Sequence, residues 1–141
     1  MAPVLDQLIE KYPQKVRLVF KNFPLRSHKF ARQAAAAALS AQAQGKFWEF
    51  HDMLFENYRA INEEKITEIR DGLNLNADDF DSMRKSGQVA RQIQNDVRLG
   101  REVGLRGTPS VYVNGRLQRS RGLEGLSASV EAELKRLNKS N

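Results

Sequence analysis

The residues best placed to do chemistry lie in the stretch "GLRGTPSVYVNG", residues 104–115. A Gly-Thr-Pro triplet stands before a β-branched run, and an Asn-Gly pair, the strongest short hairpin signal, closes that run. Proline donates no backbone hydrogen bond and is normally kept off central strands. Pro109 therefore either begins a strand as a trans residue or follows a cis Thr108–Pro109 bond, which would leave the Thr108 backbone able to pair elsewhere. The local sequence alone leaves both alternatives open.

Several kinds of chemistry are excluded by composition. The 141 residues include no cysteine, so this chain can form no disulfide, thiolate metal site or cysteine nucleophile. Only two histidines are present, and we expect no metal site and no cofactor. His51 lies in an aromatic-rich helical pattern, where we expect it to be packed and hydrogen-bonded.

The charge pattern concerns possible partners. The formal net charge is +6, and residues 98–121 hold six arginines against the single acid Glu102. A nucleic-acid surface needs aromatic rings for base stacking beside its basic residues, and only Tyr112 lies in that window, so we expect no nucleic-acid binding. A solvated basic face and a site for an anionic partner both remain open. No apolar run approaches the roughly 20 residues of a spanning helix, and we expect no membrane span.

The periodicity of apolar residues predicts the elements that position this stretch. A helix is expected over 3–12, beginning without an N-cap residue, and a strand buried on both faces over 15–23. Ser27 is expected to cap the next helix, and Trp48 to pack toward a core. The remaining predicted elements are helices over 27–44, 46–58, 62–73, 76–87, 88–104 and 125–140, and hairpin strands over 110–114 and 116–122.

This order of elements, together with the Gly-Thr-Pro triplet, resembles the DsbA-type thioredoxin fold of bacterial thiol-disulfide oxidoreductases. The resemblance is carried by residues 2–25, 27–28, 44–57 and 104–115. It implies an α/β, thioredoxin-like fold in one domain, with a helical block inserted into a small sheet. The thioredoxin-like part is then 1–26 with 105–141, and the inserted helical block is 27–104.

The same resemblance implies that the family's first strand and its Cys-x-x-Cys pair are absent from this chain. In the family these elements precede the helix predicted over 3–12. Two explanations stand: an N-terminally truncated product, which the uncapped helix favours, or a natural cysteine-free descendant. We expect the chain as given to be inactive in thiol exchange. An in-frame strand ending in Cys-x-x-Cys upstream of the Met1 codon would support truncation.

The resemblance also assigns candidate site residues. Gly107, Thr108 and Pro109 correspond to the family's cis-proline loop, whose backbone pairs with an extended polypeptide substrate. His28 has either a structural or capping role or a role in tuning a thiolate. Lys21 is either a charge buried beneath the cysteines or a surface lysine with an apolar stem. The implied partners are polypeptide substrates or a redox partner protein, in a periplasmic or other extracytoplasmic compartment.

Other functions are compatible with the same residues. A cysteine-free module of thioredoxin fold could hold a peptide or partner through the same loop. A glutathione-binding transferase is disfavoured, because no serine or threonine stands at the start of the first helix. Without the first strand, we expect 15–23 to close antiparallel against 110–114, or two copies to form a homodimer through their exposed sheet edges.

Overall fold

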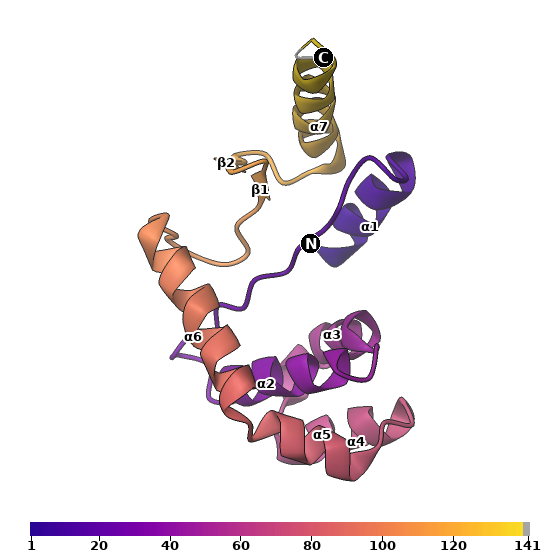
Figure 1. Ribbon diagram of the computed structural model, residues 1–141, viewed down its shortest axis with the longest axis vertical. Helices are drawn as coiled ribbons and strands as arrows, with labels where there is room; N and C mark the ends of the chain where they lie inside the picture. The colour runs from indigo at the N-terminus through magenta and orange to yellow at the C-terminus, as the bar shows by residue number, and fades with distance from the viewer. Residues whose placement is uncertain (140–141) are drawn as a thin grey trace. The chain divides into compact units, whose positions relative to one another are not determined.

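The computed structural model describes residues 1–139, which form two compact units (Figure 1). We call Met1–Phe20 with Leu105–Asn141 the hairpin unit, and Lys21–Gly104 the helical unit.

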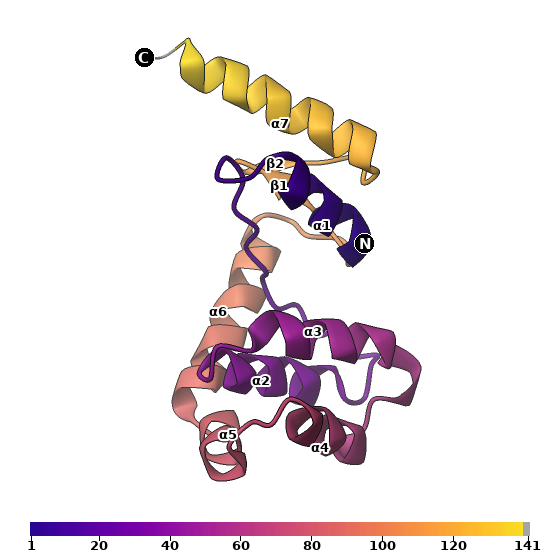
Figure 2. The same ribbon diagram turned by 90° about the vertical axis from the view of Figure 1, so that its right-hand side faces the viewer.

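In the part of it that the structure describes, the hairpin unit contains two helices and one hairpin (Figure 2). Helix α1 spans Ala2–Lys11 and helix α7 spans Leu123–Asn138. Strands β1 (Tyr112–Val113) and β2 (Arg116–Leu117) pair antiparallel, with Tyr112 opposite Leu117. Asn114 and Gly115 both have positive φ, 46° and 80°. This is the backbone that a two-residue Asn-Gly hairpin turn requires.

The core of the hairpin unit lies between α1 and α7. Leu8 lies in α1 and Tyr12 is the C-cap residue of that helix. Both are buried against Leu126 and Val130 of α7. The spacing of four residues within each pair places both members on one helical face. The Tyr12 hydroxyl also donates a hydrogen bond of 2.6 Å to Glu131 Oε1, which satisfies the polar end of a buried ring.

The helical unit contains five α-helices and one short 3₁₀ helix among its described residues (Figure 1). The three later helices begin at side-chain caps, in which Asn62, Asn76 and Ser86 accept bonds from the backbone N–H three residues on. The elements are α2 (Ala31–Gln42), α3 (Phe47–Glu56), η1 (Tyr58–Ala60), α4 (Glu63–Gly72), α5 (Ala77–Arg84) and α6 (Gly87–Glu102).

Alanines on α2 allow the helices of this unit to pack closely. Ala37, Ala38 and Ala41 are buried on the face that contacts α3 and α5. Small side chains there leave room for large ones opposite, and the rings of Phe50 and Phe80 stack with centroids 5.5 Å apart. His51 is also buried, as expected, with Nδ1 2.9 Å from Asp52 Oδ1.

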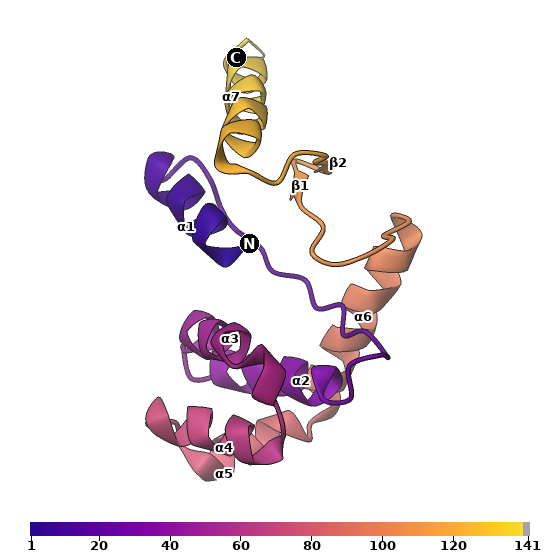
Figure 3. The ribbon, with the colours of Figure 1, turned by 180° about the vertical axis from the view of Figure 1, so that it is seen from behind.

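The strand predicted over 15–23 is wrong. The chain between α1 and α2 contains no strand, and Figure 3 draws it as a tube without a strand arrow; Val19 and Phe20 are 54% and 37% exposed. Strand β1 pairs only with β2 among residues 1–139, so 15–23 does not close against 110–114 within the chain. A β-rich sequence forms a strand only where a neighbouring strand supplies hydrogen bonds.

Two smaller expectations are also corrected. Ser27 does not cap a helix, because α2 begins at Ala31 with Phe30 at its N-cap position. Trp48 is 42% exposed rather than packed in the core, although its ring meets those of Phe47 and His51 edge-on.

A buried carboxylate that the sequence analysis did not identify holds the start of the helical unit to α6. The Asp96 side chain is only 2% exposed. Asp96 Oδ2 accepts bonds from the Asn22 backbone N–H (2.9 Å) and the Asn22 side-chain amide (3.1 Å). Asp96 Oδ1 accepts from the Gln92 amide at 3.1 Å and lies 3.4 Å from Lys21 Nζ. Asn22, itself buried, therefore depends on Asp96 for its hydrogen bonds.

We predict that Asp96→Ala lowers the free energy of unfolding of the helical unit by about 2–4 kcal/mol, because buried donors lose a charged acceptor. The single tryptophan, Trp48, lies in this unit, so urea unfolding followed by its fluorescence measures the effect. Asn95→Ala on the exposed side of the same helix is the matched control and should change stability by no more than about 0.5 kcal/mol. Equal effects of the two substitutions would contradict a special role for Asp96.

Candidate functional site

The candidate site is the exposed loop that precedes β1 in the hairpin unit. Gly107, Thr108 and Pro109 are all exposed, and the Thr108–Pro109 peptide bond is cis. A Cβ added at Gly107 would meet no atom within 4 Å. The space beside this residue is therefore open, and no internal contact requires a glycine there.

Within the Gly-Thr-Pro triplet, hydrogen bonds leave Thr108 alone without a backbone partner. The Ser110 hydroxyl donates to the Gly107 carbonyl oxygen at 2.7 Å, and Arg121 donates to the Pro109 carbonyl oxygen at 2.9 Å. Between them, the Thr108 N–H and C=O make no hydrogen bond to any residue in 1–139. Thr108 thus presents one backbone donor and one backbone acceptor, between two residues whose carbonyl groups are already hydrogen-bonded.

The hairpin that follows this loop is fixed to α7 by a buried glutamate. Glu133 Oε2 accepts bonds from Arg136 (2.8 Å) and from the Asn114 amide in the turn (3.1 Å), and Oε1 lies 3.6 Å from Arg116. The hydrogen bonds from Arg136 and Asn114 hold the pKa of Glu133 below its ordinary value, against the opposing effect of burial. The Gln118 N–H also donates to the Val111 carbonyl oxygen at 2.8 Å, which extends the pairing toward the loop.

The other two residues proposed from sequence lie in the helical unit. Lys21 is a surface lysine whose side chain is 53% exposed, with Nζ beside Asp96, so it is not a buried charge. His28 is exposed in the turn before α2, where its backbone N–H donates to the Leu25 carbonyl oxygen and its own carbonyl accepts from the Ala31 N–H. Its imidazole caps no helix, because α2 begins at Ala31.

Two residues that hold the loop were missed by the sequence analysis. Ser110 and Arg121 hold the carbonyl groups on either side of Thr108. Ser110 directly follows the Gly-Thr-Pro triplet, which is a local signal that could have identified it. Arg121 is one of six arginines in 98–121, and the sequence does not single it out. Its contact with Pro109 exists only because the hairpin brings the two residues together.

Within residues 1–139, no group of three or more histidine, aspartate or glutamate side chains is placed to hold a metal ion. None of the helices in this part of the chain has the length and apolar composition needed to cross a membrane.

Comparison with known families decides the fold family. The DSBA-like thioredoxin domain family matches residues 1–132. The chain belongs to this family. Its fold is therefore thioredoxin-like with a helical insertion, and the sheet described within residues 1–139 consists of β1 and β2.

Two groups of curated relatives are similar to the chain. It is 31% identical to the probable disulfide bond formation protein D of Bacillus anthracis, over 94% of this chain and 65% of that protein. It is also 33% identical to the Na⁺/H⁺ antiporter NhaA 3 of Salinispora tropica, over 91% of this chain. The chain spans only 20% of the antiporter, so that match concerns a small part of the relative.

Solved structures show the same fold. A thioredoxin-like oxidoreductase from Silicibacter pomeroyi matches with a TM-score of 0.82 and 26% identity, covering 95% of this chain and 77% of that one. The thiol-disulfide exchange protein α-DsbA2 of Wolbachia pipientis matches with a TM-score of 0.81 and 24% identity, over 92% of this chain and 71% of that one. At this identity the Wolbachia protein supports the fold alone.

The stabilisation that Glu133 provides depends on pH. Its folded-state pKa is lowered, so its stabilisation is present above the unfolded-state pKa of about 4.3 and is lost as pH falls through the folded-state pKa. We predict that Glu133→Gln lowers the thermal midpoint of the hairpin unit at neutral pH, and that the difference from the parent shrinks below about pH 4. Backbone amide resonances of α7 report this midpoint.

Glu10→Gln is the matched control, because Glu10 is exposed on α1 and has no ion pair within the described chain. Its midpoint should follow that of the parent at every pH. A difference between Glu133→Gln and the parent that stays constant from neutral to acid pH would contradict the assignment.

Proposed function

We propose that this chain is the peptide-binding part of a protein thiol-disulfide oxidoreductase, which forms or exchanges disulfides in substrate proteins. The observation that carries the proposal is the unpaired backbone of Thr108, exposed between two carbonyl groups that are already hydrogen-bonded. Membership of the DSBA-like family and the similarity to a probable disulfide bond formation protein support the same conclusion.

The backbone geometry suits an extended polypeptide better than a compact ligand. An N–H and a C=O on one residue are the pair that an added strand engages, and main-chain bonds of this kind accept many substrate sequences. The open space beside Gly107 lets a second backbone approach closely. Gly107, Thr108 and Pro109 are thus the proposed substrate-binding residues, with Ser110 and Arg121 as positioning residues.

The redox step requires a pair of thiols that this sequence does not contain. In the proposed mechanism, one thiolate of a Cys-x-x-Cys pair attacks a substrate disulfide, or a substrate thiolate attacks the pair's own disulfide. Either attack gives a mixed disulfide, which the second thiol of the attacking protein then resolves, so that this protein leaves oxidised and the other reduced. The loop residues hold the substrate backbone while sulfur exchange takes place. The chain as given is proposed to be inert in this reaction.

A second function is favoured by the absence of cysteine itself. The same Thr108 backbone could hold a peptide without any redox step, which makes the chain a binding module. Measuring binding and thiol exchange separately distinguishes the two functions. Peptide binding requires no added cysteines, whereas thiol exchange does.

For the domain organisation, we propose that residues 1–26 and 105–141 are the thioredoxin-like part of one domain and that 27–104 are its helical insertion. The family further suggests a periplasmic or other extracytoplasmic location.

We also propose that two copies of the chain can form a homodimer through their exposed sheet edges. Sedimentation in dilute solution tests it, and a monomer at all concentrations would exclude it.

We predict that the cysteine-free chain binds an unfolded, cysteine-free peptide, and that Thr108→Pro weakens this binding about threefold to tenfold, because one backbone donor is lost. Fluorescence anisotropy of the labelled peptide measures the affinity, and circular dichroism checks that the variant folds. Thr108→Ala is the matched control, since it keeps the N–H and removes only the side chain. Equal weakening by both variants, or no binding to the parent, would contradict the role of the backbone.

The redox proposal is tested by joining a strand that ends in Cys-x-x-Cys ahead of α1. We predict that the fused chain reduces insulin disulfides in the presence of dithiothreitol, that the same fusion with both cysteines changed to serine does not, and that adding Thr108→Pro to the active fusion lowers its rate. An inactive fusion that is folded and carries reactive thiols would refute the redox function while leaving the binding module intact.

A further inference from the structure

A pocket in the helical unit combines unpaired positive charge with a small apolar floor. It has a volume of about 400 Å³ and is lined by Arg32, Gln94, Val97, Arg98 and Arg101. Arg32 comes from α2, and the other four occupy successive turns on one face of α6. The two helices contact each other, so the pocket is formed within a single packed unit.

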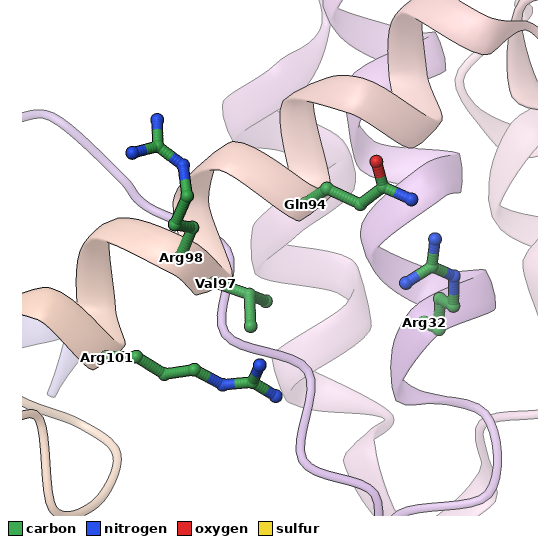
Figure 4. Close-up of a pocket in the computed structure, with 5 residues that line it drawn as sticks. All are labelled: Arg32, Gln94, Val97, Arg98 and Arg101. Atoms are coloured by element: carbon green, nitrogen blue, oxygen red, sulfur yellow. The ribbon is translucent and has the colours of Figure 1, made fainter.

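The side chains differ in where they point (Figure 4). Gln94 and Arg101 extend toward the α2 side of the pocket, where Arg32 lies, and Arg98 extends to the opposite side. Val97 is half-buried and lies between the charged groups. The arrangement therefore presents guanidinium and amide donors around a short aliphatic surface.

The charges of the three arginines are not equally compensated. Arg98 forms an ion pair with Glu102, at 2.8 Å between nitrogen and oxygen. Arg32 and Arg101 are exposed and have no ion pair or side-chain hydrogen bond with any residue in 1–139. Two uncompensated guanidinium groups on one pocket favour a ligand that supplies negative charge, and each can bind a carboxylate through two parallel hydrogen bonds.

We propose that this pocket is a recognition site for the carboxylate of a glutamate or aspartate in an acidic polypeptide segment. The carboxylate lies between Arg32 and Arg101, the Gln94 amide donates to it, and the methylene groups of the acidic side chain pack on Val97. A nucleic acid fits less well, because none of the five lining residues is aromatic and so none offers a base a stacking surface. The site is independent of the thiol-disulfide function proposed above, since it uses other residues and another ligand.

The test is binding of a fluorescent peptide of alternating Glu and Ala, compared with a peptide in which Gln replaces every Glu. The Glu peptide should bind and the Gln peptide should not, and added salt should weaken the binding. We predict that the double variant Arg32→Gln/Arg101→Gln lowers the affinity about tenfold or more. Arg98→Gln should have a smaller effect, because its charge is already paired with Glu102.

Two further variants separate local recognition from net charge and from misfolding. Lys15→Gln/Arg17→Gln removes the same number of charges from exposed positions outside the helical unit and should leave the affinity within about twofold. Arg101→Lys keeps the charge but loses the planar fork, and an intermediate affinity is expected. Because it retains the charge, this variant tests the site even if the double glutamine variant fails to fold.

Three results would overturn the proposal. Equal weakening by the two double variants would show attraction to overall charge alone. Inorganic phosphate or succinate binding the pocket as tightly as the Glu peptide would make it a site for small anions. Single-stranded DNA that binds more tightly than the peptide, and loses binding in Arg32→Gln/Arg101→Gln, would make it a nucleic-acid site.

Discussion

The attachment of the hairpin to α7 through Glu133 is the interaction on which the candidate site depends. Glu133 binds the turn residue Asn114 and lies close to Arg116 just after it, so both ends of the turn are held to one carboxylate. With the hairpin held, Arg121 reaches back to the Pro109 carbonyl group, and Ser110 takes that of Gly107. Thr108 is left as the one residue of the triplet without internal hydrogen bonds.

The segment between α1 and α2 shows what a strand-forming sequence does without a partner strand. Its β-branched and aromatic residues predicted a strand, yet Val19 is exposed and no ladder forms. Isolated extended backbone gains none of the hydrogen bonds that make a strand stable. The segment is instead fixed at its far end, where Asn22 binds the buried Asp96 of α6. Hydrogen bonds to α6 thus fix the end of this segment, in place of the strand pairing that its sequence predicted.

Features set by local sequence were predictable, and those set by distant partners were not. The helical periods, the Asn62 and Asn76 caps and the Asn-Gly turn depend on residues within one or two turns of chain. The strand over 15–23 and the roles of Asp96 and Arg121 depend on contacts far along the chain. Asp96 lies three residues after the buried Ile93, a spacing that places it on the same helical face, so its burial could have been inferred. Its partner Asn22 could not.

The most direct test of the account is hydrogen exchange at the Thr108 backbone amide, measured by nuclear magnetic resonance with and without an unfolded, cysteine-free peptide. The account predicts that this amide exchanges rapidly in the free chain and becomes protected when the peptide is bound. A Thr108 amide already protected in the free chain, or one unchanged while the peptide protects amides elsewhere, would contradict it.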